Sequence, residues 1–319
     1  MPQFIMFSLY ITSDSLAILL GAVLALKTWH YVRSPNWGEL LLLALTLVLG
    51  LLTKTTFVAA IPVLLVLVYW YPRENRRGWT NLLRADVFLI IVLALGSYKF
   101  VDNLLRYRDP FFNNMNLGED WHLEHMQTYR GLFSFVDINI GRLLISPIAS
   151  PVTEGSYPVL LYGTFWYQHI PESNFTGLMA TNYRYLGSFV FIFALIPSWF
   201  FFRGMARLAL GLPALIRNFD ATREQDKRQL TLSIMALIIV SSLALLTATV
   251  WQYHEWSILQ GRFLFPWFFA GMGAFSVGFG TGRGRVTRIL QAGILVLAGL
   301  SLLFFAGEFS LILWPMLLS

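Results

Sequence analysis

The chain has no cysteine among its 319 residues, so it offers no disulfide framework, no thiolate zinc ligand and no cysteine nucleophile. Charged residues are also scarce, at 13% of the chain, whereas soluble globular proteins carry about a quarter. The first absence excludes a disulfide-bonded scaffold and cysteine-dependent catalysis. The second excludes an ordinary soluble enzyme, because so few charges cannot cover the surface of a soluble domain of this size.

Apolar residues dominate what is present. They make up 56% of the chain, and the mean hydropathy is +0.61. This composition predicts an integral membrane protein. The net charge of +6 does not indicate a nucleic-acid partner, because the basic residues fall in short segments between apolar runs. That distribution is typical of membrane topology, and we expect membrane lipids as partners and no nucleic acid.

The apolar runs predict an all-α integral membrane protein with about eight transmembrane helices in a single membrane domain, residues 1–319. A bilayer core requires about 20 apolar residues for one crossing. The second and third runs are nearer 15 residues than 20, which favours a tight re-crossing pair or a locally thinned bilayer. The expected spans cover about residues 4–26, 39–53, 56–71, 87–105, 185–202, 230–250, 263–279 and 289–306.

The positions of the basic residues predict which ends of these spans face the cytoplasm. No Lys or Arg precedes Lys27, so the first run lacks the basic segment of a cleaved secretory signal, and we expect an uncleaved helix with its amino end outside. The longest basic loop is expected at residues 202–229, where residues 207–219 could form an amphipathic interfacial helix. With the basic loops inside, the polar stretch at residues 106–184 becomes one large extracytoplasmic loop between the fourth and fifth spans.

This loop contains a dense group of acids and imidazoles, in the sequence GEDWHLEH. Glu119 or Asp120 could act as general base toward a hydroxyl acceptor, and neighbouring aromatic surface would raise such a pKa toward the working range. Trp121, His122 and His125 are candidate contacts to an acceptor or to the loop. The alternative is a solvated amphipathic segment on the membrane surface. The spacing matches no strong metal motif, so we predict no cofactor, although a divalent metal is chemically conceivable.

Three residues outside the loop carry candidate chemistry. Asp14 lies within the first span, where an ionisable group is either functional or part of a polar seam between helices. Lys54 stands at the outer ends of two short spans, placed to hold a lipid phosphate or simply to extend to the interface. Arg262 follows a glycine at an outer boundary, which favours phosphate binding or an interfacial anchor.

The order of SDSLAILLGAVLAL, then GLLTKTTF, a large external loop and finally LQGRFLFPWF resembles the GT-C superfamily of membrane glycosyltransferases, in particular the protein mannosyltransferase and lipid A aminoarabinose transferase group. Members of that superfamily transfer a sugar from a polyprenyl-phosphate carrier to a lipid, glycan or protein on the extracytoplasmic side. The resemblance implies that Asp14 matches the acid opening the corresponding helix. It also implies that Lys54 and Arg262 match the basic residues that neutralise the donor phosphate.

The chain departs from that superfamily in one respect. The superfamily's acidic catalytic motif lies in a first external loop, ahead of the helix that Asp14 resembles. The resemblance therefore implies either that an amino-terminal part precedes this sequence or that Glu119 or Asp120 supplies the base. Lacking that loop, the chain could also be a transferase that is inactive alone.

The resemblance thus implies a glycosyltransferase that uses a polyprenyl-phosphate-linked sugar, with its active side extracytoplasmic. The absence of cysteine and the short loops favour a bacterial or archaeal plasma membrane. The alternative is a non-catalytic membrane component, such as a lipid-linked glycan transporter or a scaffold subunit acting with a partner subunit. A transporter would line a path between the two leaflets with its acids and bases. Here the polar residues gather in one external loop, which favours the transferase.

Overall fold

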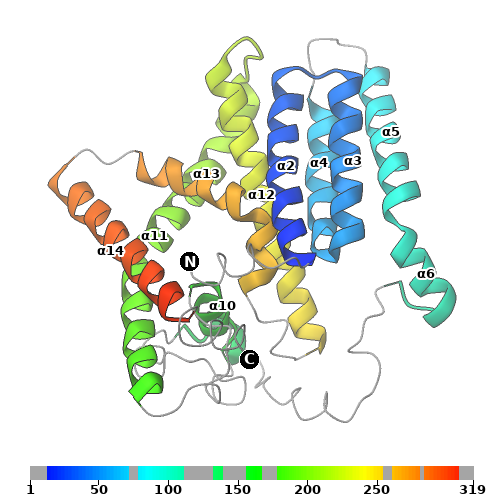
Figure 1. The fold of residues 1–319 in the computed structure, drawn as a ribbon. Helices are drawn as coiled ribbons and strands as arrows, with labels where there is room; N and C mark the ends of the chain where they lie inside the picture. The colour runs from blue at the N-terminus through cyan, green and yellow to red at the C-terminus, as the bar shows by residue number, and fades with distance from the viewer. Residues whose placement is uncertain are drawn as a thin grey trace.

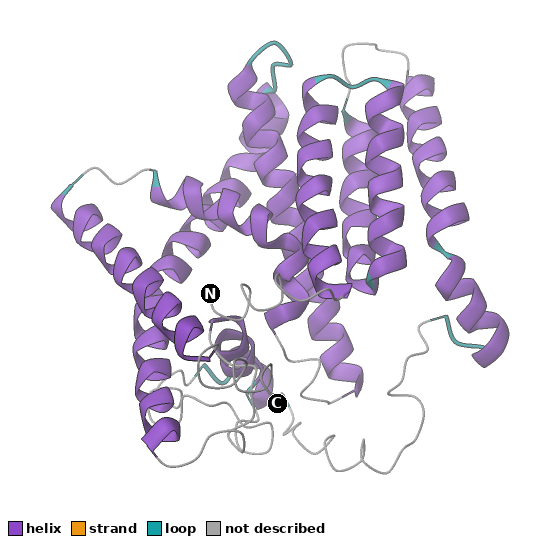
Figure 2. Cartoon of the chain, viewed as in Figure 1, coloured by secondary structure: helices purple, strands orange, loops and turns teal. Residues whose placement is uncertain are grey.

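The computed structural model describes residues 13–71, 78–110, 132–138, 156–166, 178–253, 261–280 and 284–308. Every regular element in these ranges is a helix, and none of the described residues belongs to a strand (Figure 2). The prediction of an all-α protein is confirmed for this part of the chain.

The elements fall into an amino-terminal group, short helices from the predicted external loop, and a carboxyl-terminal group. The first group is α2 Ser13–Arg33, α3 Trp37–Thr53, the 3₁₀ helix η1 Thr55–Ala59, α4 Ala60–Trp70, α5 Gly78–Gly96 and α6 Tyr98–Tyr107. The short helices are α8 Phe133–Val136 and α10 Tyr157–Trp166. The last group is α11 Leu178–Asn218, α12 Glu224–Tyr253, the 3₁₀ helix η6 Gly261–Trp267, α13 Phe268–Phe279 and α14 Arg285–Glu308.

Helices α2 to α5 stand side by side, and α12 packs against α2 and α4 (Figure 1). Large side chains fill the space between them, and Tyr31, Phe57 and Phe88 are each fully buried. Two tyrosines also connect the ends of α2 and α4, because the hydroxyl of Tyr31 donates to the Tyr71 carbonyl at 3.4 Å and Tyr71 donates to the Val32 carbonyl. These contacts make one continuous core from helices separated in the sequence.

The helix ends gather at two levels. The start of α2, the α3–η1 junction, the end of α5, the start of α11 and the end of α12 lie at one end of the bundle (Figure 1). The α2–α3 and α11–α12 connections lie at the opposite end. This alternation places the start of α2 on the same side as the end of α6 and the start of α11, the described helices that border the predicted external loop.

Four helical segments in the described ranges are long and apolar enough to cross a membrane, namely Ser13–Arg33, Trp79–Gly96, Ser188–Asn218 and Glu224–Trp251. Large apolar side chains are exposed on these and neighbouring helices, such as Ile90 at 63% on α5, Val66 at 63% on α4 and Leu295 at 74% on α14. Apolar surface of this extent is costly in water and suits contact with lipid. These features support a membrane protein.

Two predicted boundaries were wrong. The fourth apolar helix is α5, which ends at Gly96 instead of continuing to residue 105, and Ser97 separates it from α6. The basic stretch at residues 202–229 is not a long loop, because α11 continues to Asn218 and α12 begins at Glu224. The helix expected at residues 207–219 is the last part of α11 instead of a separate interfacial helix. Pro197 and Pro213 lie inside α11 without ending it, which is common where neighbouring helices support the freed backbone groups.

Candidate functional site

The candidate site lies where α2 begins and α3 ends. Lys54 forms an ion pair with the carboxylate of Asp14, although the two residues are 40 positions apart. Only 13% of each side chain is exposed. Asp14 occupies the first turn of α2, where the helix dipole favours a negative charge. Lys54 has an extended backbone that separates α3 from η1. This break turns the chain back, so the Lys54 side chain reaches α2.

The segment η6 approaches the same point from the carboxyl-terminal half. The Nζ atom of Lys54 lies 4.9 Å from the centre of the Phe263 ring, within the range of a cation–π contact. A Cβ atom added at Gly21 would lie 1.8 Å from the Pro266 carbonyl oxygen. Only glycine at this position of α2 permits η6 to pack so closely. Lys54 is thereby held between an acid and an aromatic ring.

Arg262 lies in η6, directly before Phe263. The structure therefore brings together Asp14, Lys54 and the backbone segment that carries Arg262; the side chain of Arg262 is outside what the structure describes. These are the three residues that the sequence singled out beyond the acidic cluster. Their spacing in the chain, 40 residues between the first two and more than 200 to the third, gives no local reason for them to meet.

Helix α10, from within the predicted external loop, docks against η6. The backbone N–H of Gly261 donates to the hydroxyl of Thr164 at 2.8 Å. A Cβ atom added at Gly261 would lie 2.5 Å from the Cα atom of Phe165, so glycine is required for this approach as well. The rings of Phe165 and Phe265 are 5.9 Å apart. The loop thus contributes a helix that covers the start of η6.

The same helix is anchored to α11 and α12. The hydroxyl of Tyr162 donates to the Phe191 carbonyl at 2.6 Å, and the indole N–H of Trp166 donates to the Ser198 hydroxyl at 3.2 Å. Thr247 and Tyr157 pair through their hydroxyls at 3.1 Å. These aromatics lie within residues 106–184, the stretch that the sequence predicted to be a polar external loop. The run YPVLLYGTFW, which is apolar over one short helix, is the signal that could have identified a packed element.

Two further buried polar groups belong to η1, which follows Lys54, and to η6, which carries Arg262. The hydroxyl of Thr56 and the indole nitrogen of Trp267 are buried and have no hydrogen-bond partner among the described residues. The ring of Trp267 packs on Phe57, with ring centres 5.0 Å apart. An indole N–H is only a donor, and a hydroxyl can donate. Thr56 lies in η1, the segment that begins directly after Lys54, and Trp267 ends η6. Both unsatisfied donors therefore belong to the segments that adjoin or carry the two basic candidates, and donors of this kind suit an anionic or oxygen-rich ligand.

The acidic cluster of Glu119, Asp120, Trp121, His122 and His125 lies outside the described residues, so its predicted role stays a prediction. In the ranges that the structure does describe, no group of three or more His, Asp or Glu side chains is arranged to hold a metal ion.

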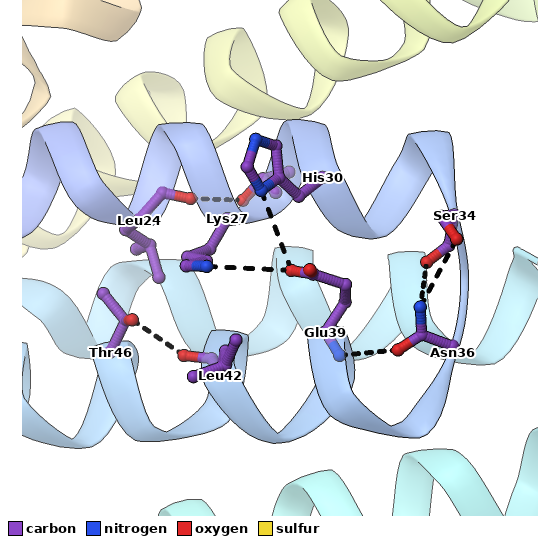
Figure 3. Close-up of polar contacts among 9 residues, drawn as sticks. Leu24, Lys27, His30, Ser34, Asn36, Glu39, Leu42 and Thr46 are labelled. Atoms are coloured by element: carbon purple, nitrogen blue, oxygen red, sulfur yellow. Dashed lines mark hydrogen bonds and ion pairs between the residues drawn. The ribbon is translucent and has the colours of Figure 1, made fainter.

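A separate polar cluster stands at the other end of α2. Figure 3 shows the carboxylate of Glu39 facing two basic side chains of α2, with Lys27 Nζ at 3.8 Å and His30 Nδ1 at 3.9 Å from its Oε2 atom. Asn36 caps α3 by accepting from the Glu39 N–H at 2.9 Å. This cluster joins α2 to α3 and does not contact Asp14 or Lys54, which lie at the opposite end of these helices.

Comparison of the chain with protein-family models, curated proteins and solved structures gives no match. The functional argument therefore depends on the residues and the geometry described above.

Proposed function

We propose that the chain is a membrane glycosyltransferase that moves a sugar from a polyprenyl-phosphate donor to a lipid, glycan or protein acceptor. The observation that supports this proposal is the position of Lys54, held by Asp14 and Phe263 at one end of the helical bundle. A lysine there can bind the phosphate of a lipid whose tail lies along the apolar helices. Arg262, carried by the adjoining η6 segment, is proposed as the second phosphate ligand.

The proposed reaction is a direct displacement at the anomeric carbon of the donor sugar. An acceptor oxygen forms the new bond to that carbon, while the bond between the carbon and the phosphate oxygen breaks. The departing phosphate keeps the electron pair, and Lys54 and Arg262 stabilise its charge. Glu119 or Asp120 takes the proton of the acceptor, with Trp121, His122 and His125 as contacts to the acceptor. Asp14 is proposed to orient Lys54 before the donor binds.

We also propose how many times the chain crosses the membrane and which side its large loop faces. The four long helices and the shorter apolar helices Trp37–Thr53, Thr55–Trp70, Phe263–Phe279 and Arg288–Leu300 support about eight crossings. We propose that residues 106–184 lie on the extracytoplasmic side, because the candidate site and α10 are at the bundle end where this loop begins. A bacterial or archaeal plasma membrane is the proposed location, and a partner subunit is compatible with this arrangement.

The test uses the full chain reconstituted in lipid nanodiscs, with binding and transfer measured separately. Binding is measured with radiolabelled polyprenyl monophosphate, and transfer with a panel of polyprenyl-phosphate-linked sugars. Lys54→Met and Arg262→Gln should each weaken binding roughly 10-fold or more, because each removes a charged partner of the phosphate. Glu119→Gln and Asp120→Asn should both still bind polyprenyl monophosphate. If Glu119 is the general base, Glu119→Gln should abolish transfer; if Asp120 is the base, Asp120→Asn should abolish it.

Lys99→Met is the matched control, because Lys99 is an exposed lysine of α6. It should leave binding and transfer unchanged. Unaltered binding in Lys54→Met would contradict the phosphate site. Binding that depends on Lys54 without any transfer would instead favour the non-catalytic alternative, a transporter or scaffold that holds a lipid-linked glycan.

A further inference from the structure

Arg207 is an arginine inside the long helix α11, at the first residue of the interfacial helix that the sequence predicted within its basic stretch. Its side chain is partly buried, and its Nη1 atom is buried without a hydrogen-bond partner among the described residues. It forms no ion pair with another residue in the ranges that the structure covers. Burying a guanidinium N–H group without a hydrogen-bond acceptor costs free energy, and a bound ligand that accepts this hydrogen bond would remove the cost.

Helix α12 carries a second buried polar group without a hydrogen-bond partner in the described part of the chain, the hydroxyl of Ser233, at the level of Arg207 along the bundle. A Cβ atom added at Gly211 would lie 3.0 Å from Gln229 Nε2, which sets the register between the antiparallel helices α11 and α12. Arg207 lies four residues before Gly211 in α11, and Ser233 lies four residues after Gln229 in α12. Because the two helices are antiparallel, this register places Arg207 level with Ser233. Ser233 is 2% exposed, and its hydroxyl is also buried without a partner.

The position along the bundle shows what kind of ligand could reach this pair. Lys227 Nζ donates to the Arg33 carbonyl at 3.3 Å, so Lys227 is level with the carboxyl end of α2. Ser233 follows six residues later in α12, or about 9 Å deeper at 1.5 Å per residue. The pair thus lies just inside the end of the bundle opposite the candidate site.

We infer that Arg207 and Ser233 form a binding site for the phosphate of an anionic phospholipid at the end of the bundle opposite Lys54. The guanidinium supplies charge and N–H donors, and the serine supplies a hydroxyl donor. A phosphodiester oxygen accepts both and relieves both unsatisfied groups. The acyl chains of the lipid then lie along the exposed apolar surface of the preceding part of α11, which includes Trp199 and Phe202. This site is independent of the proposed transfer reaction.

The experiment measures how strongly the full chain retains phosphatidylglycerol, using nanodiscs of phosphatidylcholine that contain a small fraction of phosphatidylglycerol and native mass spectrometry after release. Arg207→Gln should weaken retention roughly 10-fold or more, and Ser233→Ala by a smaller factor, because a charged hydrogen bond contributes more than a neutral one. Arg207→Lys should retain part of the binding. Arg217→Gln, at the exposed end of the same helix, should leave retention unchanged.

Several results would overturn the inference. Equal retention in Arg207→Gln would exclude the site, and so would equal retention of phosphatidylcholine and phosphatidylglycerol by the unaltered chain. Displacement of the lipid by millimolar inorganic phosphate would identify a free-anion site instead of a lipid site. Should Arg207→Gln fail to give folded protein, Ser233→Ala and Arg207→Lys decide the question, because the first change is small and the second keeps the positive charge. Retention by both variants equal to that of the unaltered chain would exclude the site.

Discussion

Lys54 and Asp14 form an ion pair that connects the α3–η1 break to the first turn of α2. Each residue lies in an otherwise apolar stretch, and each side chain is 13% exposed. The pair explains how two ionisable groups are tolerated next to membrane helices, because each charge neutralises the other. It also places the ammonium group beside Phe263 and the segment that carries Arg262.

Breaking this ion pair should destabilise the fold. Asp14→Asn or Lys54→Met alone should lower the free energy of unfolding by about 3 kcal/mol, because a largely buried charge loses its partner. The double variant should lose less than the sum of the single changes, as measured by thermal unfolding in detergent. Asp102→Asn is the control, because its pair with Arg106 is solvent-exposed and should contribute less than about 1 kcal/mol. Additive losses in the double variant would show that the two charges are not coupled.

The crossing of α11 and α13 should tolerate no side chain at Gly204. A Cβ atom there would lie 1.8 Å from the Ala274 carbonyl oxygen, and one at Gly278 would lie 1.9 Å from the Phe200 carbonyl oxygen. Gly204→Ala should therefore force the backbones apart and destabilise the protein by about 1–3 kcal/mol in a detergent unfolding experiment. Gly299→Ala in α14 is the control, because nothing lies within 4 Å of its added Cβ atom. Equal stability of the two variants would contradict this close packing.

The hydrogen bond between α10 and η6 should contribute to both stability and donor binding. Thr164→Val removes the acceptor of the buried Gly261 N–H and should cost about 1–3 kcal/mol. Under the proposed function, it should also weaken the binding of polyprenyl monophosphate, because η6 carries Arg262. Thr249→Val is the control, since the Thr249 hydroxyl donates to the Leu245 carbonyl within its own helix. A loss of stability no larger than in this control would mean that α10 does not anchor η6.

The membrane orientation can be tested with single cysteines, because the natural chain contains none and gives no background labelling. Ser34→Cys and Thr222→Cys lie in the connections at one end of the bundle, and Tyr107→Cys lies at the end of α6 at the other. In intact cells, a membrane-impermeant maleimide should label only Tyr107→Cys, and all three should react after the membrane is permeabilised. Labelling of Ser34→Cys in intact cells would reverse the proposed orientation.

Much of the architecture was predictable from local sequence. Long apolar runs can satisfy their backbone groups in a bilayer only as helices, so the all-α class follows from composition and spacing. The break at Lys54 was also visible, because TKTT interrupts two apolar runs. The end of α5 was misplaced, since apolar residues continue beyond Gly96 into the amphipathic helix α6 and hydropathy alone does not mark the kink at Ser97.

Other features depend on contacts between distant segments. The basic residues of 202–229 predicted a loop with a separate interfacial helix at 207–219, but α11 is continuous to Asn218, with Gly204 packed against α13 and Gly211 against α12. Likewise, no local signal pairs Asp14 with Lys54 or Thr164 with Gly261. The sequence by itself determined a helical membrane protein with a small set of candidate residues. Only the tertiary structure decided which of them meet, because ion pairs and close glycine contacts form between helices and leave no periodicity in either one.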